Sequence, residues 1–261
     1  MGRKQDGANV ISEKQISSGF QSFWSELLPL LTPSCVTLIN RSYGENIEGC
    51  RPVDIELGIA QGSLNDQDLY AEVSFEVFRS SRLLKVECEE VIGKDATFLL
   101  AWEAALRKIR LHRRVAAAEK PLDGTLPYRY IGAVCRRYEK FISQYECHDV
   151  VINPQLMGCG MLGMCEADIS IDYRLIEVKT VSRSFSSRDI RQLIIYLALD
   201  SISGANRWSQ AVLFNPRAAR YVALEPRPII EYVSAGRSSI DVYRSIESLL
   251  LSREFEVDSK F

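Results

Sequence analysis

Alternating apolar and polar positions mark residues 166–179 as two short strands joined by a tight turn. Ile169 and Ile171 alternate with polar neighbours, and the chain after Tyr173 returns to an apolar run that ends at Val178. A period of two is that of a pleated strand, in which successive side chains point to opposite faces. The pattern therefore predicts a β-hairpin in the second half of the chain.

The same kind of pattern predicts strands and helices on both sides of this hairpin. In residues 69–78, for example, apolar residues alternate with polar ones, which favours a strand. Residues 1–20 are polar, with glycine and serine, and we expect a loose end there. The other expected strands cover residues 36–40, 55–59, 83–89, 150–154, 209–216 and 220–225. The expected helices cover residues 20–31, 97–118, 130–145, 188–199 and 239–253.

A turn-rich segment separates two parts of the chain. Residues 121–127 contain two prolines and a glycine, which interrupt regular structure. The 261 residues suffice for one large domain or two small ones. We therefore expect an N-terminal mixed α/β extension over residues 1–127 and a second domain over residues 128–261.

Composition narrows the class of protein. Hydrophobic residues make up 46% and charged residues 25% of the chain, an ordinary globular balance. The net charge of −2 counts against a protein that coats DNA without specificity, but it leaves room for a local basic groove. No apolar run reaches the length of a membrane span, and the N-terminus lacks a leader or myristoylation pattern. We expect a cytoplasmic protein with no membrane partner.

The expected hairpin gathers charged side chains. Glu177 and Lys179 are two positions apart, so both point to one face of the strand, while Val178 points to the other. Pairing of the two strands would bring Asp168 close to Glu177. Carboxylate oxygens are the ligands that Mg²⁺ prefers, and a lysine beside the metal can position water or balance negative charge. The hairpin therefore predicts a metal-dependent site.

This segment resembles the active-site hairpin of the PD-(D/E)XK nuclease superfamily. Asp168 matches the metal-binding acid, and Glu177-Val178-Lys179 matches the D/E-x-K element. The resemblance implies that Asp168 and Glu177 bind Mg²⁺, that the Val178 carbonyl completes the metal shell, and that Lys179 is catalytic. Mn²⁺ would serve as a substitute.

A second motif resembles the RecB-like branch of the same superfamily. Gln192 and Tyr196 match its Gln-x-x-x-Tyr helix, and their spacing of four places both on one helix face. The resemblance implies that both support catalysis and contact nucleic acid. A polar pair satisfied within the core is the other interpretation.

The resemblance also implies a fold. It is the restriction-endonuclease-like core, a mixed central sheet flanked by helices in the order helix, three strands, helix, strand. The order of elements expected between residues 130 and 224 agrees with it. Some RecB-like nucleases carry an iron–sulfur cluster whose cysteines follow the nuclease motif. Because no cysteine follows Cys165, we expect no such cluster here.

Several neighbouring residues have two interpretations each. Asp172 is either a third site acid or a turn residue, and the second is favoured because it lies near the turn. Glu166 and Glu139 are further candidates to assist the metal, with solvent exposure as the alternative for Glu139. A zinc site is disfavoured because the spacing of its four candidate ligands matches no Cys-x-x-Cys arrangement. These are Cys147, His148, Cys159 and Cys165.

Two groups of basic residues could contact phosphate. Arg183, Arg188 and Arg191 lie before or on the expected Gln-x-x-x-Tyr helix, and residues 107–114 form a basic run. Arginine forks match phosphate oxygens, and a solvated charged surface is the alternative in both cases.

Together these features predict a metal-dependent nuclease that hydrolyses phosphodiester bonds, with DNA as the expected substrate. By analogy with standalone nucleases of genome-defence loci, we expect an antiviral role and partner proteins of a defence complex. A catalytically silent nuclease-fold subunit that binds nucleic acid or scaffolds such a complex is the main alternative. An ordinary α/β domain with an accidental Glu-x-Lys is another.

Overall fold

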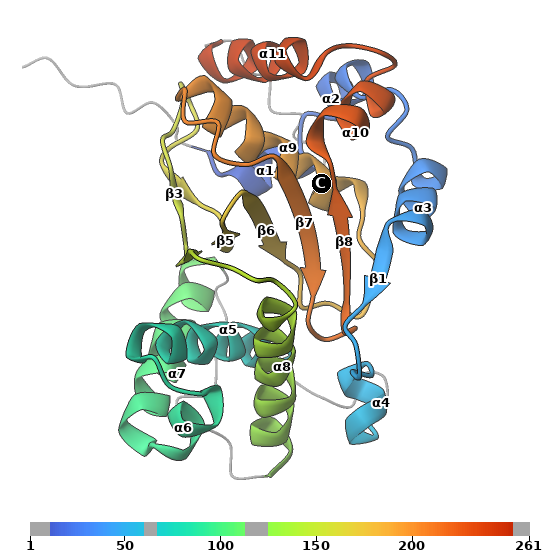
Figure 1. Ribbon diagram of the computed structural model, residues 1–261. Coiled ribbons are helices and arrows are strands. Elements are labelled where there is room, and N and C mark those ends of the chain that lie inside the picture. The colour runs from blue at the N-terminus through green and yellow to red at the C-terminus, as the bar shows by residue number, and fades with distance from the viewer. Residues whose placement is uncertain (1–10, 60–66, 113–124, 253–261) are drawn as a thin grey trace, which may run out of the picture.

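A mixed six-stranded sheet lies between two layers of helices in the computed structural model (Figure 1). The structure describes residues 11–59, 67–112 and 125–252. The strands of the main sheet are β1 (Gly44–Asn46), β2 (Val150–Ile152), β5 (Ile169–Ile171), β6 (Arg174–Val178), β7 (Gln210–Asn215) and β8 (Arg220–Leu224). A separate small sheet pairs β3 (Gln155–Leu156) with β4 (Cys165–Glu166).

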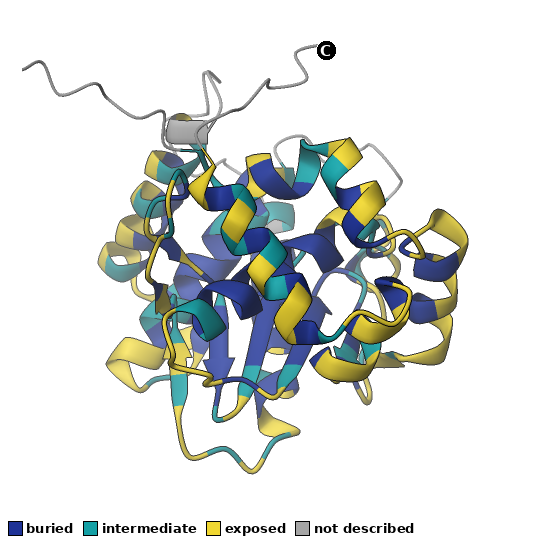
Figure 2. Ribbon diagram, turned by 90° about the horizontal axis from the view of Figure 1, so that it is seen from above, coloured by how far each residue is buried: buried dark blue, intermediate teal, exposed yellow. Residues whose placement is uncertain are grey.

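The order of strands in the main sheet is β1-β8-β7-β6-β5-β2. Neighbours are antiparallel except for β6 and β7, which are parallel. Parallel neighbours need a crossover connection, and here the chain between them forms a helix. The central strands are thereby buried on both faces, as Figure 2 shows.

The helices divide between the two faces of the sheet. They are α1 (Glu13–Ser18), α2 (Gln21–Leu27), α3 (Pro33–Ser42), α4 (Val53–Leu57), α5 (Gln67–Leu84), α6 (Cys88–Gly93), α7 (Asp95–His112), α8 (Thr125–Ser143), α9 (Ser187–Ile202), α10 (Pro226–Val233) and α11 (Ser239–Leu251). Residues of α1–α3 and α9–α11 form one core with Leu175 and Leu213. Residues of α4–α8 form the other core with Ile176 and Val212. Neighbouring residues of one strand thus belong to opposite cores, as the pleat requires.

The expected strands at residues 69–78 and 83–89 are wrong. Residues 67–84 form α5, and Cys88 begins α6. The alternation was misleading because Glu76, which looked like a solvent-facing position, is buried and pairs with Lys108 of α7. The buried positions Tyr70, Val73 and Val77 instead follow the spacing of three and four of a helix.

The expected strands at residues 36–40 and 55–59 are also wrong. The first lies in α3, where the Thr32 side chain accepts a hydrogen bond from the Cys35 amide and Pro33 occupies the first turn. Both are helix-start signals that outweigh the short apolar run. The second overlaps α4, which ends at Leu57 and is capped by Gly58 with a left-handed backbone, φ 65°.

The second half of the chain agrees with the pattern. The hairpin is formed by β5 and β6, and the helices expected at residues 130–145, 188–199 and 239–253 correspond to α8, α9 and α11. The strands expected at residues 150–154, 209–216 and 220–225 correspond to β2, β7 and β8. The order α8, β2, β5, β6, α9, β7 is helix, three strands, helix, strand, with the β3–β4 pair inserted after β2.

The two parts of the chain share the sheet and both cores. The expected boundary between residues 127 and 128 falls inside α8, and β1 from the first part pairs with β8 from the second. The expected helix at 97–118 corresponds to α7 as far as His112, and residues 113–118 lie outside the described part of the chain. Within the described ranges, no helix is both long and apolar enough to traverse a bilayer.

Candidate active site

The hairpin places Asp168 beside the second strand. In the β5–β6 register Ile169 lies opposite Ile176, so the preceding Asp168 comes opposite Glu177. Residues opposite each other on antiparallel strands point to the same face. Asp168 is fixed there because its Oδ2 accepts a hydrogen bond from the Val178 amide at 2.7 Å.

Glu177 and Lys179 form an ion pair at the end of β6. Lys179 Nζ lies 2.6 Å from Glu177 Oε1, and Glu177 is only 2% exposed. The other carboxylate oxygen of Glu177, Oε2, is buried without a hydrogen-bond partner in the structure. A buried, unpaired carboxylate oxygen is costly, so it marks a position suited to a cation.

Gln192 and Tyr196 extend this pair into a polar chain. Lys179 Nζ donates to Gln192 Oε1 at 2.7 Å, and Gln192 Nε2 donates to the Tyr196 hydroxyl at 2.8 Å. The Tyr196 hydroxyl donates in turn to the main-chain oxygen of Glu166 at 3.3 Å. The residues expected from both motifs therefore lie together in one place.

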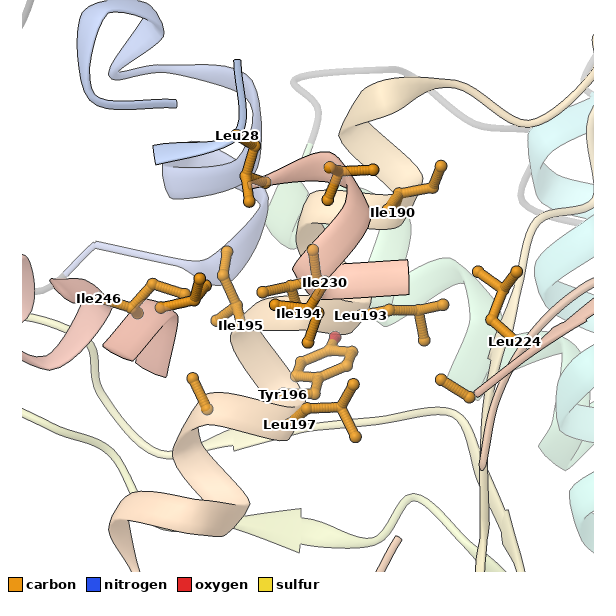
Figure 3. Packing of buried hydrophobic residues seen from close by; sticks show 14 of the residues in the cluster. Leu28, Ile190, Leu193, Ile194, Ile195, Tyr196, Leu197, Leu224, Ile230 and Ile246 are labelled. Carbon is orange, nitrogen blue, oxygen red and sulfur yellow. The ribbon is translucent and has the colours of Figure 1, made fainter. Parts of the chain in front are cut away.

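Helix α9 holds its two polar residues rigidly. The helix starts with a capping box in which Ser186 and Asp189 satisfy each other's backbone amides. Ile190, Ile194 and Leu197 pack into the core on one side of the sheet, and Figure 3 shows Tyr196 among them. Because the helix is anchored by apolar contacts, Gln192 reaches Lys179 from a fixed backbone.

The electrostatics of the site favour a bound cation. Burial and the charge of Glu177 raise the pKa of Asp168 to about 7. Burial opposes the charge of Lys179 as well, but Glu177 and Asp168 outweigh it and raise the pKa of Lys179. Lys179 is therefore protonated, and its positive charge interacts with the side chains of both Glu177 and Asp168.

A cleft of about 940 Å³ opens beside the hairpin. Asp168 and Val178 line it, together with α1 on one side and α5 and α7 on the other. Its charged lining is mostly acidic, and Lys108 on the far wall is paired with Glu72 and Glu76 at 2.9 and 2.6 Å. Such a cleft repels phosphate unless a cation binds first.

The donor set available to a metal consists of two carboxylates and a backbone carbonyl. Asp168, Glu177 and the Val178 carbonyl would hold Mg²⁺, an ion that takes oxygen ligands and keeps several waters. The described residues contain no group of three or more His, Cys, Asp or Glu side chains able to hold a metal.

Several alternatives from the sequence are resolved by contacts. Asp172 is the turn residue of the hairpin, with φ 48° and its Oδ1 accepting the amides of His148 and Asp149. Glu139 accepts the Cys88 amide at 2.8 Å at the start of α6, so it serves that helix. Glu166 Oε1 accepts from Gln155 at the cleft wall.

The three arginines near α9 differ in their surroundings. Arg183 pairs with Asp189 at 2.6 Å, and Arg191 is buried against the Trp24 ring, where Nη1 donates to Gln21 Oε1 at 3.2 Å. Arg188 is exposed. In the basic run, Arg107 and Arg110 are exposed, while residues 113 and 114 lie outside the described part.

Two residues at the site, Asp189 and Glu72, were not predicted from the sequence. Asp189 lies near Lys179 and raises the pKa of Lys179 by its charge; the spacing of Ser186 and Asp189 is a capping signal that could have drawn attention to it. Glu72 lines the far wall of the cleft beside Lys108 of the basic run, and it was not predicted because α5 was expected to be a strand.

No protein-family model, curated protein or solved structure matches this chain.

Proposed function

We propose that the protein is a metal-dependent nuclease that hydrolyses phosphodiester bonds in DNA. The observation that carries the proposal is the buried, unpaired Glu177 Oε2 in a chain of contacts that also holds Lys179, Gln192 and Tyr196. The order of elements is compatible with a restriction-endonuclease-like core. The choice of DNA rests on the resemblance of the motifs.

The metal would be held by Asp168, Glu177 and the Val178 carbonyl. A bound Mg²⁺ supplies Lewis-acid polarisation of a phosphate oxygen and lowers the pKa of water. Asp168 must be ionised to serve, and its raised pKa means that metal and proton compete for it.

Lys179 would stabilise negative charge that develops on the phosphate. Its ammonium is kept protonated by Glu177 and Asp168, and it is held at one position by two hydrogen bonds. A fixed cation in a water-poor site stabilises a transition state without reorganising during the reaction.

Gln192 and Tyr196 would act as positioning residues. Gln192 uses its carbonyl oxygen for Lys179 and its amide nitrogen for the Tyr196 hydroxyl, which fixes the orientation of the amide. Burial raises the pKa of Tyr196 well above its usual value, so the hydroxyl stays protonated and donates to the Glu166 carbonyl.

An assay on circular and linear DNA with Mg²⁺, with Mn²⁺ and with EDTA tests the proposal. We expect cleavage with either metal and none in EDTA. Cleavage that persists in EDTA would contradict the mechanism. DNA binding without cleavage under all conditions would favour the silent-subunit alternative.

A further inference from the structure

A second, smaller cavity lies beyond Lys179 on the side of α3 and β1. Its volume is about 90 Å³, roughly the space of three waters in the liquid. That space suits a compact group such as a phosphate. The polar lining consists of Asn40, Ser182, Arg183, Ser184, Asn215 and Arg220.

The lining of this cavity contrasts with the acidic cleft. It includes two guanidinium groups, two hydroxyls and two amides, and no carboxylate. The serines are exposed at its mouth, and Arg183 is partly neutralised by Asp189. The Asn40 amide already donates to the Val36 and Phe185 oxygens and the Asn215 amide to the Val181 oxygen, so the guanidinium groups and the hydroxyls are the donors that match the oxygens of a phosphate.

Arg220 provides the charge that is not neutralised. Nη2 donates to the Asn40 main-chain oxygen, and the buried Nε has no hydrogen-bond partner in the structure. No carboxylate of the described residues lies within ion-pair distance of it. A side chain at Gly44 would collide with this guanidinium, so the glycine makes room for it.

The cavity adjoins the candidate active site through the backbone. The Lys179 amide donates to the Phe214 oxygen at 2.8 Å, so the next residue, Asn215, borders Lys179. Asn215 Nδ2 donates to the Val181 oxygen at 2.8 Å, which ties down the loop that carries Ser182. The cavity thus lies against the segment that follows β6, and Val178 and Thr180 of the same segment line the acidic cleft.

We propose that this cavity is a phosphate subsite, in which Arg220, Ser182 and Arg183 bind a phosphate group of the substrate next to the one that is cleaved. The inference rests on the proposed function for the identity of the substrate. The phosphate belongs either to the backbone of a strand or to its 5′ end, and both have the same recognition chemistry. Because the cleft itself is acidic, this subsite would supply the attraction for the substrate's negative charge.

Isothermal titration calorimetry in EDTA tests the subsite without cleavage. The probes are inorganic phosphate and a short oligonucleotide with and without a 5′-phosphate. We expect Arg220→Gln to weaken phosphate binding at least about tenfold, because a charged hydrogen bond is lost. Arg244→Gln, on the exposed face of α11, is the matched control and should bind as the wild type does.

Ser182 offers a second pair of variants that spare the fold. Ser182→Glu places a carboxylate at the mouth and should abolish phosphate binding, whereas the neutral Ser182→Gln, of the same length, should weaken binding only by the loss of one hydroxyl. Both changes lie on an exposed loop residue, so the pair decides the matter even if Arg220→Gln unfolds. Preference for the 5′-phosphorylated probe assigns a terminal phosphate, and equal affinity assigns a backbone phosphate.

Equal phosphate affinity in Ser182→Glu and Ser182→Gln, or no binding by the wild type, would overturn the subsite. Its failure differs from failure of the proposed function. A protein that binds phosphate here but cleaves no DNA with Mg²⁺ keeps the subsite and loses the nuclease. A protein that cleaves DNA with Mg²⁺, but whose variants all bind phosphate as the wild type does, keeps the nuclease function and loses the subsite.

Discussion

Lys179 Nζ lies 2.7 Å from Gln192 Oε1, which joins the end of β6 to the second turn of α9. The same ammonium lies 2.6 Å from Glu177, so one cation connects the hairpin to the helix. The ion pair alone would still allow the flexible Lys179 side chain to adopt several rotamers. The contact with Gln192 fixes it over the hairpin, and this contact can be tested separately from the charge.

Replacing Gln192 by alanine should reduce turnover more than it reduces stability. Lys179 would keep its ion pair with Glu177 but lose its orientation, while the Tyr196 hydroxyl would keep the Glu166 carbonyl. If the pair were only structural, the loss of a buried partner would cost about 1–3 kcal/mol with normal specific activity. Melting temperature and cleavage rate of the same preparation separate the two outcomes.

The contribution of Asp168 to the stability of the metal-free protein should fall as the pH rises from 3.8 towards 7. Asp168 has a folded-state pKa of about 7 against 3.8 for the free side chain, so the folded protein holds the proton more tightly than the unfolded chain. This contribution is fully present below pH 3.8 and is lost as the pH passes through 7. Urea unfolding across this range measures it.

Asp168→Asn is the control for that titration. The amide cannot ionise but can still accept from the Val178 amide, so its stability should depend less on pH. Mg²⁺ should raise the melting temperature of the wild type near pH 8 and have little effect on this variant. Identical pH profiles for the two proteins would mean that Asp168 does not carry the proton.

Asp172→Ala should destabilise the fold and leave catalysis per folded molecule unchanged. The carboxylate accepts two amides, and alanine tolerates φ 48° poorly, so the cost should be on the order of 1–3 kcal/mol. Chemical denaturation with activity normalised to folded protein measures both effects. A loss of metal affinity in this variant would instead indicate that Asp172 is a third acid of the metal site.

The sequence was most informative where the signal was local. The hairpin could be predicted because alternation and a turn at Asp172 lie within ten residues, and Gln192 and Tyr196 because four residues make one helical turn. The prediction for residues 69–78 was wrong because Glu76, a charged residue, is buried in an ion pair with Lys108 that joins α5 to α7. Nothing near Glu76 in sequence distinguishes it from an exposed residue.

Other features depend on distant parts of the chain. Strand β1 has three residues and exists through its pairing with β8, far along the chain. The cavity around Arg220 combines α3, the loop after β6, and the ends of β7 and β8. No window of the sequence contains these elements together, so only the three-dimensional arrangement could reveal them.

The measurement that tests the central claim most directly is the Mg²⁺-dependent rate of DNA cleavage by Lys179→Ala. Lys94→Ala is the matched control, since Lys94 is exposed at the end of α6, away from the lining of the cleft, and forms an ion pair with Glu90 of that helix. The account predicts a loss of roughly a hundredfold or more for Lys179→Ala, with its fold intact, and wild-type rates for Lys94→Ala. Equal rates for the two variants, both folded and both active with Mg²⁺, would contradict it.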